Sequence, residues 1–199
     1  MKIPLEYAIG ATPLDPNEID GLIPSDINSQ NQLNAAEQQN IVSAYEWALN
    51  KKHVNILSET FIRELHQKMF ESVWRWAGKY RKSDKSIGVA WINIPEEIQK
   101  LVADVNYWLQ NKTYDWNELG ARFHHRLVSV HPFPNGNGRH ARLITDKLLH
   151  HNQQKQFTWG AKSIKDGLLS ESRLRNKYIS ALRLADEKNM KALIEFVRS

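Results

Sequence analysis

Apolar residues recur every three or four positions over most of the chain, which is the spacing of one buried face of an α-helix. Ser58 precedes one such stripe as a helix cap, and Asp115 with Glu118 resembles a capping box before another. Pro95 suits the first turn of a third. The pattern therefore predicts an all-α fold, with stripes that include Ile41, Phe61, Ile98, Leu119, Leu143, Leu174 and Leu193.

Two segments depart from the helical period. Residues 86–94 are rich in β-branched and aromatic side chains, which favours a short hairpin or an extended strand. Residues 1–32 are rich in Pro, Asp, Asn and Ser and have no sustained period, so we expect an ordered N-terminal arm. No repeat or low-complexity linker interrupts residues 33–199. We expect one helical domain there, forming a compact unit with the arm.

Composition narrows the class of protein. A chain of 199 residues is long enough to bury one sizeable core, and the absence of cysteine excludes disulfides and thiolate metal sites. The net charge of +5 favours anionic partners such as nucleotides. Nucleic-acid binding is a weaker alternative, because no tract is rich in Lys or Arg. Without a signal peptide or an apolar run near ~20 residues, we expect a soluble, cytoplasmic protein that does not enter a membrane.

The stretch His131–Arg142 carries the chemistry of the chain. Gly136 and Gly138 permit close backbone approach, so the amides around them can form an anion-binding concavity. A helix that begins there adds its free N–H groups and the positive end of its dipole. Arg139 and Arg142 are three positions apart on that helix and suit phosphate oxygens. These residues predict a site for a phosphate-bearing ligand.

His131 lies across this loop from the arginines and is the candidate general base, since imidazole titrates at about 6.5. A histidine zinc site is the alternative, drawing on His124, His125 and further histidines. The chain lacks an H-E-x-x-H motif and cysteine, and adjacent His124 and His125 fall on different helix faces. These features favour structural or solvated roles for the other histidines.

This stretch resembles the motif of the Fic (Fido) family, H-P-F-x-[D/E]-G-N-[G/K]-R-x-x-R, and only Asn135 departs from it. The resemblance implies a Fic helical bundle with a short β-hairpin flap beside the active site. Residues 74–81, 87–89, 123–127 and 157–160 are similar to the subgroup called mobile mystery protein B. That subgroup is toxin-like and implies a helix-turn-helix, antitoxin-like partner.

The family resemblance implies transfer of AMP from ATP to a hydroxyl side chain of a target protein that the sequence does not identify. His131 would deprotonate the hydroxyl, and Phe133 would anchor the loop in the core. The resemblance further implies that phosphate and nucleotide contacts come from Gly136, Asn137, Gly138, Arg139, Arg142 and Tyr178, with Trp159 near the base. An alternative function within the fold is a weakly active or inactive nucleotide-binding or interaction module.

In the family an acidic residue at position 135 binds Mg²⁺ (or Mn²⁺). Asn135 keeps an oxygen ligand and lacks the charge, so we expect weaker metal binding here.

Two further roles follow from the resemblance. Ile87, Gly88 and Val89 would form a flap that holds the target by strand addition, whereas a plain edge hairpin over the core is the alternative. Glu37 would be an inhibitory glutamate paired with Arg142. The alternative role for Glu37 is structural: an acidic residue in the first turn of a helix is favoured by the helix dipole.

Overall fold

Capping side chains begin several helices where the sequence predicts. Ser58 Oγ accepts a hydrogen bond from the Phe61 N–H at 3.1 Å. Asp115 Oδ1 accepts one from the Glu118 N–H at 2.9 Å. Each bond satisfies an amide that has no acceptor inside its own helix. The helix starts predicted near residues 58 and 115 are confirmed.

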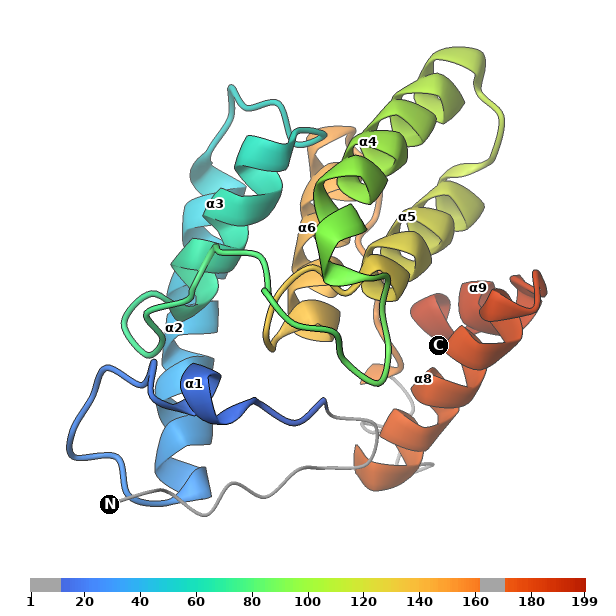
Figure 1. Ribbon diagram of the computed structural model, residues 1–199. Helices are drawn as coiled ribbons and strands as arrows, with labels where there is room; N and C mark the ends of the chain where they lie inside the picture. The colour runs from blue at the N-terminus through green and yellow to red at the C-terminus, as the bar shows by residue number, and fades with distance from the viewer. Residues whose placement is uncertain (1–11, 162–170) are drawn as a thin grey trace.

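The structure, a computed structural model, describes residues 12–161 and 171–199. The described elements are α1 Pro16–Ile19, α2 Gln30–Asn50, α3 Glu59–Phe70, the 3-10 helix η1 Trp91–Asn93, α4 Ile94–Asn111, α5 Trp116–Val130, α6 Asn137–His151, α8 Glu171–Asp186 and α9 Lys191–Arg198 (Figure 1). Within these residues the regular secondary structure is helical, apart from an isolated β-bridge between Leu22 and Trp74. The predicted helical class is confirmed.

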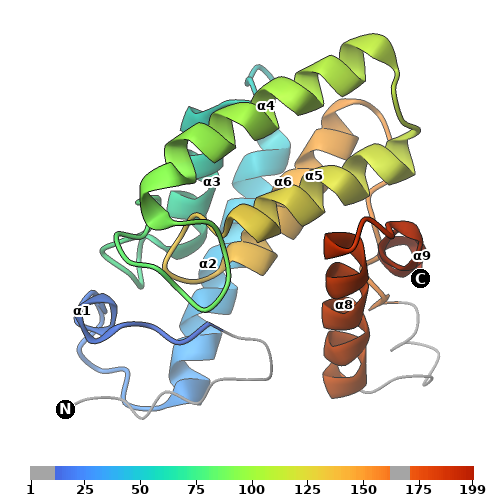
Figure 2. The same cartoon turned by 45° about the vertical axis from the view of Figure 1, so that its right-hand side comes forward.

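Helix α6 lies at the centre of the bundle. It packs against α2, α3 and α5, while α4 runs beside α5 and α8 pairs with α9 (Figures 1 and 2). Ala141, Ile144 and Leu149 of α6 have no exposed surface. Ala141 and Ile144 belong to the main core, and Leu149 belongs to a second cluster with residues of α8 and α9. The helix that follows the motif is thus fixed from several sides.

The segment expected to form a β-hairpin is a bent loop followed by η1, and it contains no strand. Arg81 Nη2 donates to the Val89 carbonyl, and the Trp91 N–H donates to Asp84 Oδ1 at 2.8 Å. Side chains therefore satisfy backbone groups that a partner strand would have satisfied. The hairpin prediction for Ile87, Gly88 and Val89 is wrong; we call residues 83–90 the flap loop.

The described part of the N-terminal arm crosses the bundle below the flap loop (Figure 1). The Ile23 N–H donates to the Val73 carbonyl at 2.9 Å, and the Arg75 N–H donates to the Gly21 carbonyl at 2.8 Å. These bonds attach the arm to the segment after α3. No helix in residues 12–161 or 171–199 has the length and apolar character required of a membrane span.

Candidate active site

The motif forms a tight loop between α5 and α6. His131 caps the C-terminus of α5 in the left-handed region, with φ 53° and ψ 58°. Gly136 precedes α6 with φ 77°, and a Cβ atom there would lie 2.4 Å from Phe70 Cζ. Glycine is required here, because it adopts a positive φ without strain and has no Cβ atom to clash with the Phe70 ring. The predicted loop and the predicted helix start are both confirmed.

Asn137 holds this loop together. Its Oδ1 accepts from the Phe133 N–H at 2.9 Å, and its Nδ2 donates to the Phe133 carbonyl at 2.8 Å. Phe133 has no exposed surface, which confirms that it anchors the loop in the core. Asn137 is among the residues expected to contact phosphates. In the structure its side chain is hydrogen-bonded within the loop, and its backbone N–H is the first of α6.

His66 supports the same loop from α3. The Gly78 N–H donates to His66 Nδ1 at 3.0 Å, so the proton resides on Nε2, which donates to the Asn135 carbonyl at 3.1 Å. Burial holds the pKa of His66 well below its usual value, so the ring is neutral. The ring stacks on Phe133 at 3.7 Å between centroids. In the sequence, His66 is one polar residue beside an apolar stripe, and nothing marks its distant partner.

A cleft of about 840 Å³ opens over the start of α6. The first helical hydrogen bond joins the His140 N–H to the Gly136 carbonyl at 2.9 Å, so the amides of residues 137–139 precede the helical ladder. Gly138, Arg139 and Arg142 line the cleft. Free amides, the positive end of a helix dipole and guanidinium groups together suit an anion.

The two motif arginines extend toward opposite walls of the cleft. Arg139 Nη1 donates to Glu37 Oε2 of α2 at 2.6 Å. The Arg142 guanidinium lies 5.5 Å from the ring centroid of Tyr178 on α8. Side chains three positions apart on a helix point in directions that differ by about 60°, so Arg139 and Arg142 diverge. Arg175, which sequence reasoning did not identify, also lines the cleft.

Glu37 pairs with the first motif arginine, so the predicted pair with Arg142 is wrong. Its side chain is 9% exposed, and its Oε1 accepts from Trp74 Nε1 at 2.7 Å. Because α2 begins at Gln30, Glu37 lies in the helix interior. The alternative that it stabilises a first turn through the helix dipole is therefore wrong.

His131 also lines the cleft. The residue is 7% exposed, and within the described part of the chain neither ring nitrogen has a hydrogen-bond partner. Burial, followed by the charges of Arg81 and Lys85, lowers the pKa of His131 to about 4. The ring is neutral near pH 7 and keeps a lone pair that can accept a proton.

Asn135 provides no anionic oxygen. Its Oδ1 accepts from the Gly136 N–H at 2.6 Å, and its carbonyl is bonded to His66. Among the described residues, no three His, Cys, Asp or Glu side chains gather as a metal site. These donors do not fit a resident metal ion, and the histidine zinc alternative is not supported for this part of the chain.

Tyr178 and Trp159 line the far wall of the cleft, and the buried His124 contacts both of them. The Tyr178 hydroxyl lies 2.8 Å from His124 Nε2, and the Trp159 ring centroid lies 4.6 Å from that of His124. Burial lowers the pKa of His124 to about 3, so this ring too is neutral. The side chain of Asp146 accepts from Trp159 Nε1 at 2.8 Å and fixes the indole. Tyr178 and Trp159 therefore give this wall an aromatic surface.

Solved Fic domains share this fold. The N-terminal Fic domain of an effector protein from Bartonella sp. AR 15-3 superposes with a TM-score of 0.70 at 15% identity, covering 92% of this chain and 91% of that one. BepC of Bartonella tribocorum, solved with bound AMPPNP, gives a TM-score of 0.67 at 17% identity, covering 92% and 98%. These likenesses establish the Fic fold.

Sequence comparison adds the family. The Fic/DOC family matches residues 56–149, which include the whole motif. A probable protein adenylyltransferase of Aquifex aeolicus is 32% identical over 148 residues, covering 71% of this chain and 42% of that protein. Protein adenylyltransferase Fic of Nematostella vectensis is 36% identical over 76 residues, covering 37% and 18%. The chain belongs to the Fic/DOC family, and it spans less than half the length of these curated relatives.

Proposed function

We propose that this protein is a Fic-type nucleotidyltransferase that transfers AMP from ATP to a hydroxyl side chain of a target protein. In this reaction the hydroxyl oxygen bonds to the α-phosphorus and the bond from that phosphorus to the bridging oxygen breaks. Pyrophosphate leaves, and the hydroxyl proton passes to His131. The family membership and the relatives named as protein adenylyltransferases support the proposal.

The observation that carries the proposal is the state of His131. A buried imidazole with two unpartnered nitrogens and a lowered pKa lines the same cleft as the free amides and the arginines. A structural histidine would use at least one ring nitrogen in a hydrogen bond. A neutral imidazole beside an anion site can accept the proton of a nucleophile.

The remaining roles follow from position. The amides at the start of α6, with Gly136, Asn137 and Gly138, would hold the phosphates, and Arg139 and Arg142 would orient the outer ones for in-line attack. Tyr178 and Trp159 would contact the nucleoside. Because the donors around Asn135 do not fit a resident ion, we assign no step to a metal.

We also propose that Glu37 restrains the site. Its carboxylate occupies two donors, Arg139 Nη1 and Trp74 Nε1, at 2.6 and 2.7 Å. An outer phosphate would compete with it for Arg139. A toxin-like role and a helix-turn-helix partner remain predictions from the subgroup resemblance.

The test uses ATP labelled at the α-phosphate. We expect His131→Ala to reduce label transfer to protein by at least about 100-fold, the size of a lost general base, with nucleotide affinity within about twofold of wild type. His150→Ala is the control, because His150 is exposed at the other end of α6. A His131→Ala protein that transfers label at the wild-type rate would refute the mechanism.

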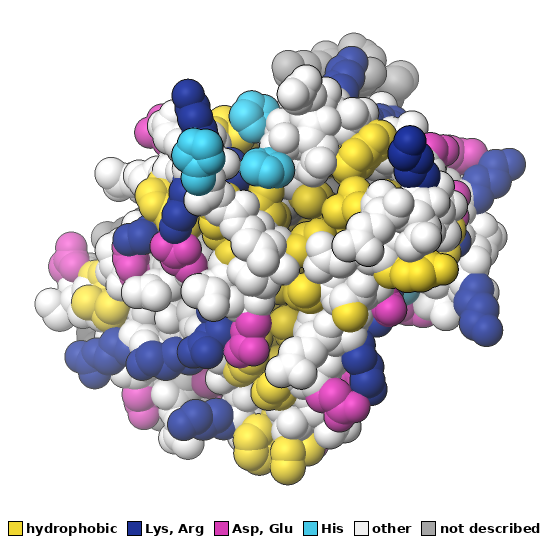
Figure 3. All heavy atoms as spheres, turned by 90° about the horizontal axis from the view of Figure 1, so that it is seen from above, with side chains coloured by type: hydrophobic (Ala, Val, Ile, Leu, Met, Phe, Trp, Pro, Cys, Tyr) yellow, Lys and Arg dark blue, Asp and Glu magenta, His cyan; other side chains and the backbone are white. Residues whose placement is uncertain are grey.

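Asn135 favours a second candidate function, a nucleotide-binding module with little catalysis. Nucleotide binding without label transfer, in both wild type and Glu37→Gly, would establish it. Nucleic-acid binding has less support. On the face seen in Figure 3, Lys and Arg side chains are dispersed among Asp and Glu side chains.

A further inference from the structure

Arg81 is a buried cation whose hydrogen bonds go to backbone carbonyls. Its side chain has no exposed surface, and the carboxylate of Asp84, whose side chain is 69% exposed, lies 3.8 Å away. Its Nε donates to the His131 carbonyl at 2.7 Å, and its Nη1 donates to the Ser83 carbonyl at 2.7 Å. Its Nη2 donates to the Val89 carbonyl. A buried guanidinium is tolerated only when its donors are satisfied, and here backbone carbonyls satisfy them.

These bonds fix the turn that carries His131. The residue adopts φ 53°, which is unusual for a side chain other than glycine. Besides the guanidinium bond to the His131 carbonyl, the Arg81 N–H donates to the Pro132 carbonyl at 2.9 Å. Pro132 has no N–H with which to hold the turn itself. Arg81 therefore contacts two consecutive carbonyls of the motif.

The same guanidinium fixes the flap loop above His131. Gly88 has φ +102°, and a Cβ atom there would lie 2.7 Å from His131 Cβ and 2.8 Å from Arg81 Nη2. Gly88 thus packs directly against both residues. Two carbonyls of the flap loop, those of Ser83 and Val89, bind Arg81. The Arg81 side chain therefore connects the His131 turn to the flap loop.

We propose that Arg81 is the positioning residue of this site: it holds the His131 turn and the flap loop in one hydrogen-bonded array, so that the imidazole keeps a single orientation beneath Gly88. The inference rests on the proposed function for its catalytic consequence. Arg81 acts through His131 and does not line the cleft. Nucleotide binding should therefore be independent of it.

Arg81 also contributes charge. After burial, two cations lower the pKa of His131: Arg81, just before the flap loop, and Lys85, within it. Lys85 is itself paired with Asp15 and Glu18 of the arm. The other charged or titratable cleft residues are Glu37, Arg139, Arg142, His125, Arg175, Tyr178, Arg183 and Asp186. Removing the Arg81 cation raises the pKa of His131. The base is then protonated, and inactive, up to a higher pH.

The experiment compares Arg81→Gln, Arg81→Lys and Arg63→Gln in the full chain. Arg63 is the control, because its Nε also donates to a backbone carbonyl, that of Gly78 at 3.0 Å, while its other contacts are with Glu59 and Tyr80, outside both the flap loop and the His131 turn. We measure kcat and KM for ATP across pH, nucleotide affinity, and the NMR titration of the His131 ring. Circular dichroism and thermal unfolding verify the fold of each variant.

For Arg81→Gln we expect at least a tenfold loss of kcat, an unchanged KM for ATP, and an acid limb and a His131 titration at higher pH. Arg81→Lys keeps the cation, so it should lose kcat while the His131 titration stays near that of wild type. Arg63→Gln should match wild type. A folded Arg81→Gln protein with wild-type kcat and an unmoved His131 titration overturns the proposal.

Two further outcomes are decisive. If Arg81→Gln does not fold, Arg81→Lys decides alone: a twofold or smaller change in kcat, with unshifted His131 and Gly88 resonances, overturns the positioning role. If neither wild type nor Glu37→Gly transfers label, the proposed function fails. The NMR titration and the resonance shifts of the His131 and Gly88 amides in the variants then still test Arg81.

Discussion

Asn135 is the residue at which the motif departs from the Fic pattern, and it defines a test of metal dependence. Asn135→Asp would place a carboxylate beside the amides that begin α6, and it could still accept from the Gly136 N–H, now at 2.6 Å. We expect the Mg²⁺ concentration for half-maximal transfer to fall by roughly tenfold, about 1.4 kcal/mol. The measurement is label transfer at fixed ATP over a Mg²⁺ series.

Asn111→Asp, an exposed position at the end of α4, controls for the added charge. An Asn135→Asp protein whose Mg²⁺ requirement equals that of wild type would show that position 135 does not contact the metal. At this scale the sequence identified the deviating residue correctly. It could not show that the Asn135 oxygens are already bonded to Gly136 and His66.

At the scale of elements, α2 and α6 meet through Glu37 and Arg139. We expect Glu37→Gly to raise self-modification and ATP affinity by roughly tenfold, because a charged hydrogen bond that competes with phosphate is removed. Glu37→Gln should give an intermediate effect, since an amide oxygen can still accept from Trp74. Intact-mass spectrometry after incubation with ATP measures the first quantity.

Glycine also weakens a helix, so Glu46→Gly at an exposed position of α2 is the matched control. Equal self-modification in Glu37→Gly and Glu46→Gly would contradict the restraining role. The sequence indicated that α2 carries a glutamate toward the motif. It gave the wrong arginine, because the choice between Arg139 and Arg142 depends on which wall of the cleft each α6 position faces.

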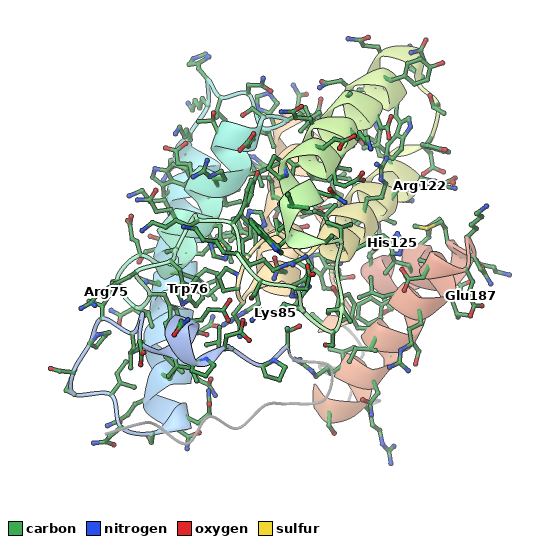
Figure 4. All side chains as sticks on the ribbon, in the orientation of Figure 1. Arg75, Trp76, Lys85, Arg122, His125 and Glu187 are labelled. Atoms are coloured by element: carbon green, nitrogen blue, oxygen red, sulfur yellow. The ribbon has the colours of Figure 1, made fainter. Side chains whose placement is uncertain are left out.

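For the whole molecule, we propose that the arm, residues 1–32, and the Fic domain, residues 33–199, unfold as one unit. Lys85 connects them: its side chain is 3% exposed and pairs with Asp15 at 2.8 Å and Glu18 at 2.7 Å. Trp76 Nε1 also donates to the Glu18 carbonyl at 3.0 Å. Lys85 and Trp76 both lie beside α1 (Figure 4).

Lys85→Met should therefore lower the free energy of unfolding by about 2 kcal/mol, because two carboxylates lose a largely buried partner. Urea unfolding, followed by circular dichroism and tryptophan fluorescence, should show a single transition in wild type. Lys82→Met, at an exposed position just before the flap loop, is the control. Two separate transitions in wild type would contradict the single unit.

The sequence by itself determined the helices, the start of α6 and the motif for which we propose phosphate binding. Helical periods, caps and glycine positions depend on neighbours within a few residues, so these predictions held for the caps at Ser58 and Asp115 and for the loop at Gly136. The hairpin error has the same origin. The β-branched composition of residues 86–94 favoured a hairpin, but the Val89 carbonyl there accepts from the distant side chain of Arg81.

Only the tertiary structure decided how the site is assembled. His66 reaches Asn135 across 69 positions, Arg81 reaches His131 across 50, and Glu37 reaches Arg139 across 102. No pattern of spacing records such pairs, because helix packing sets which faces meet. The environment that leaves both nitrogens of His131 unpartnered, and lowers its pKa through burial, likewise arises only when the flap loop closes over the end of α5.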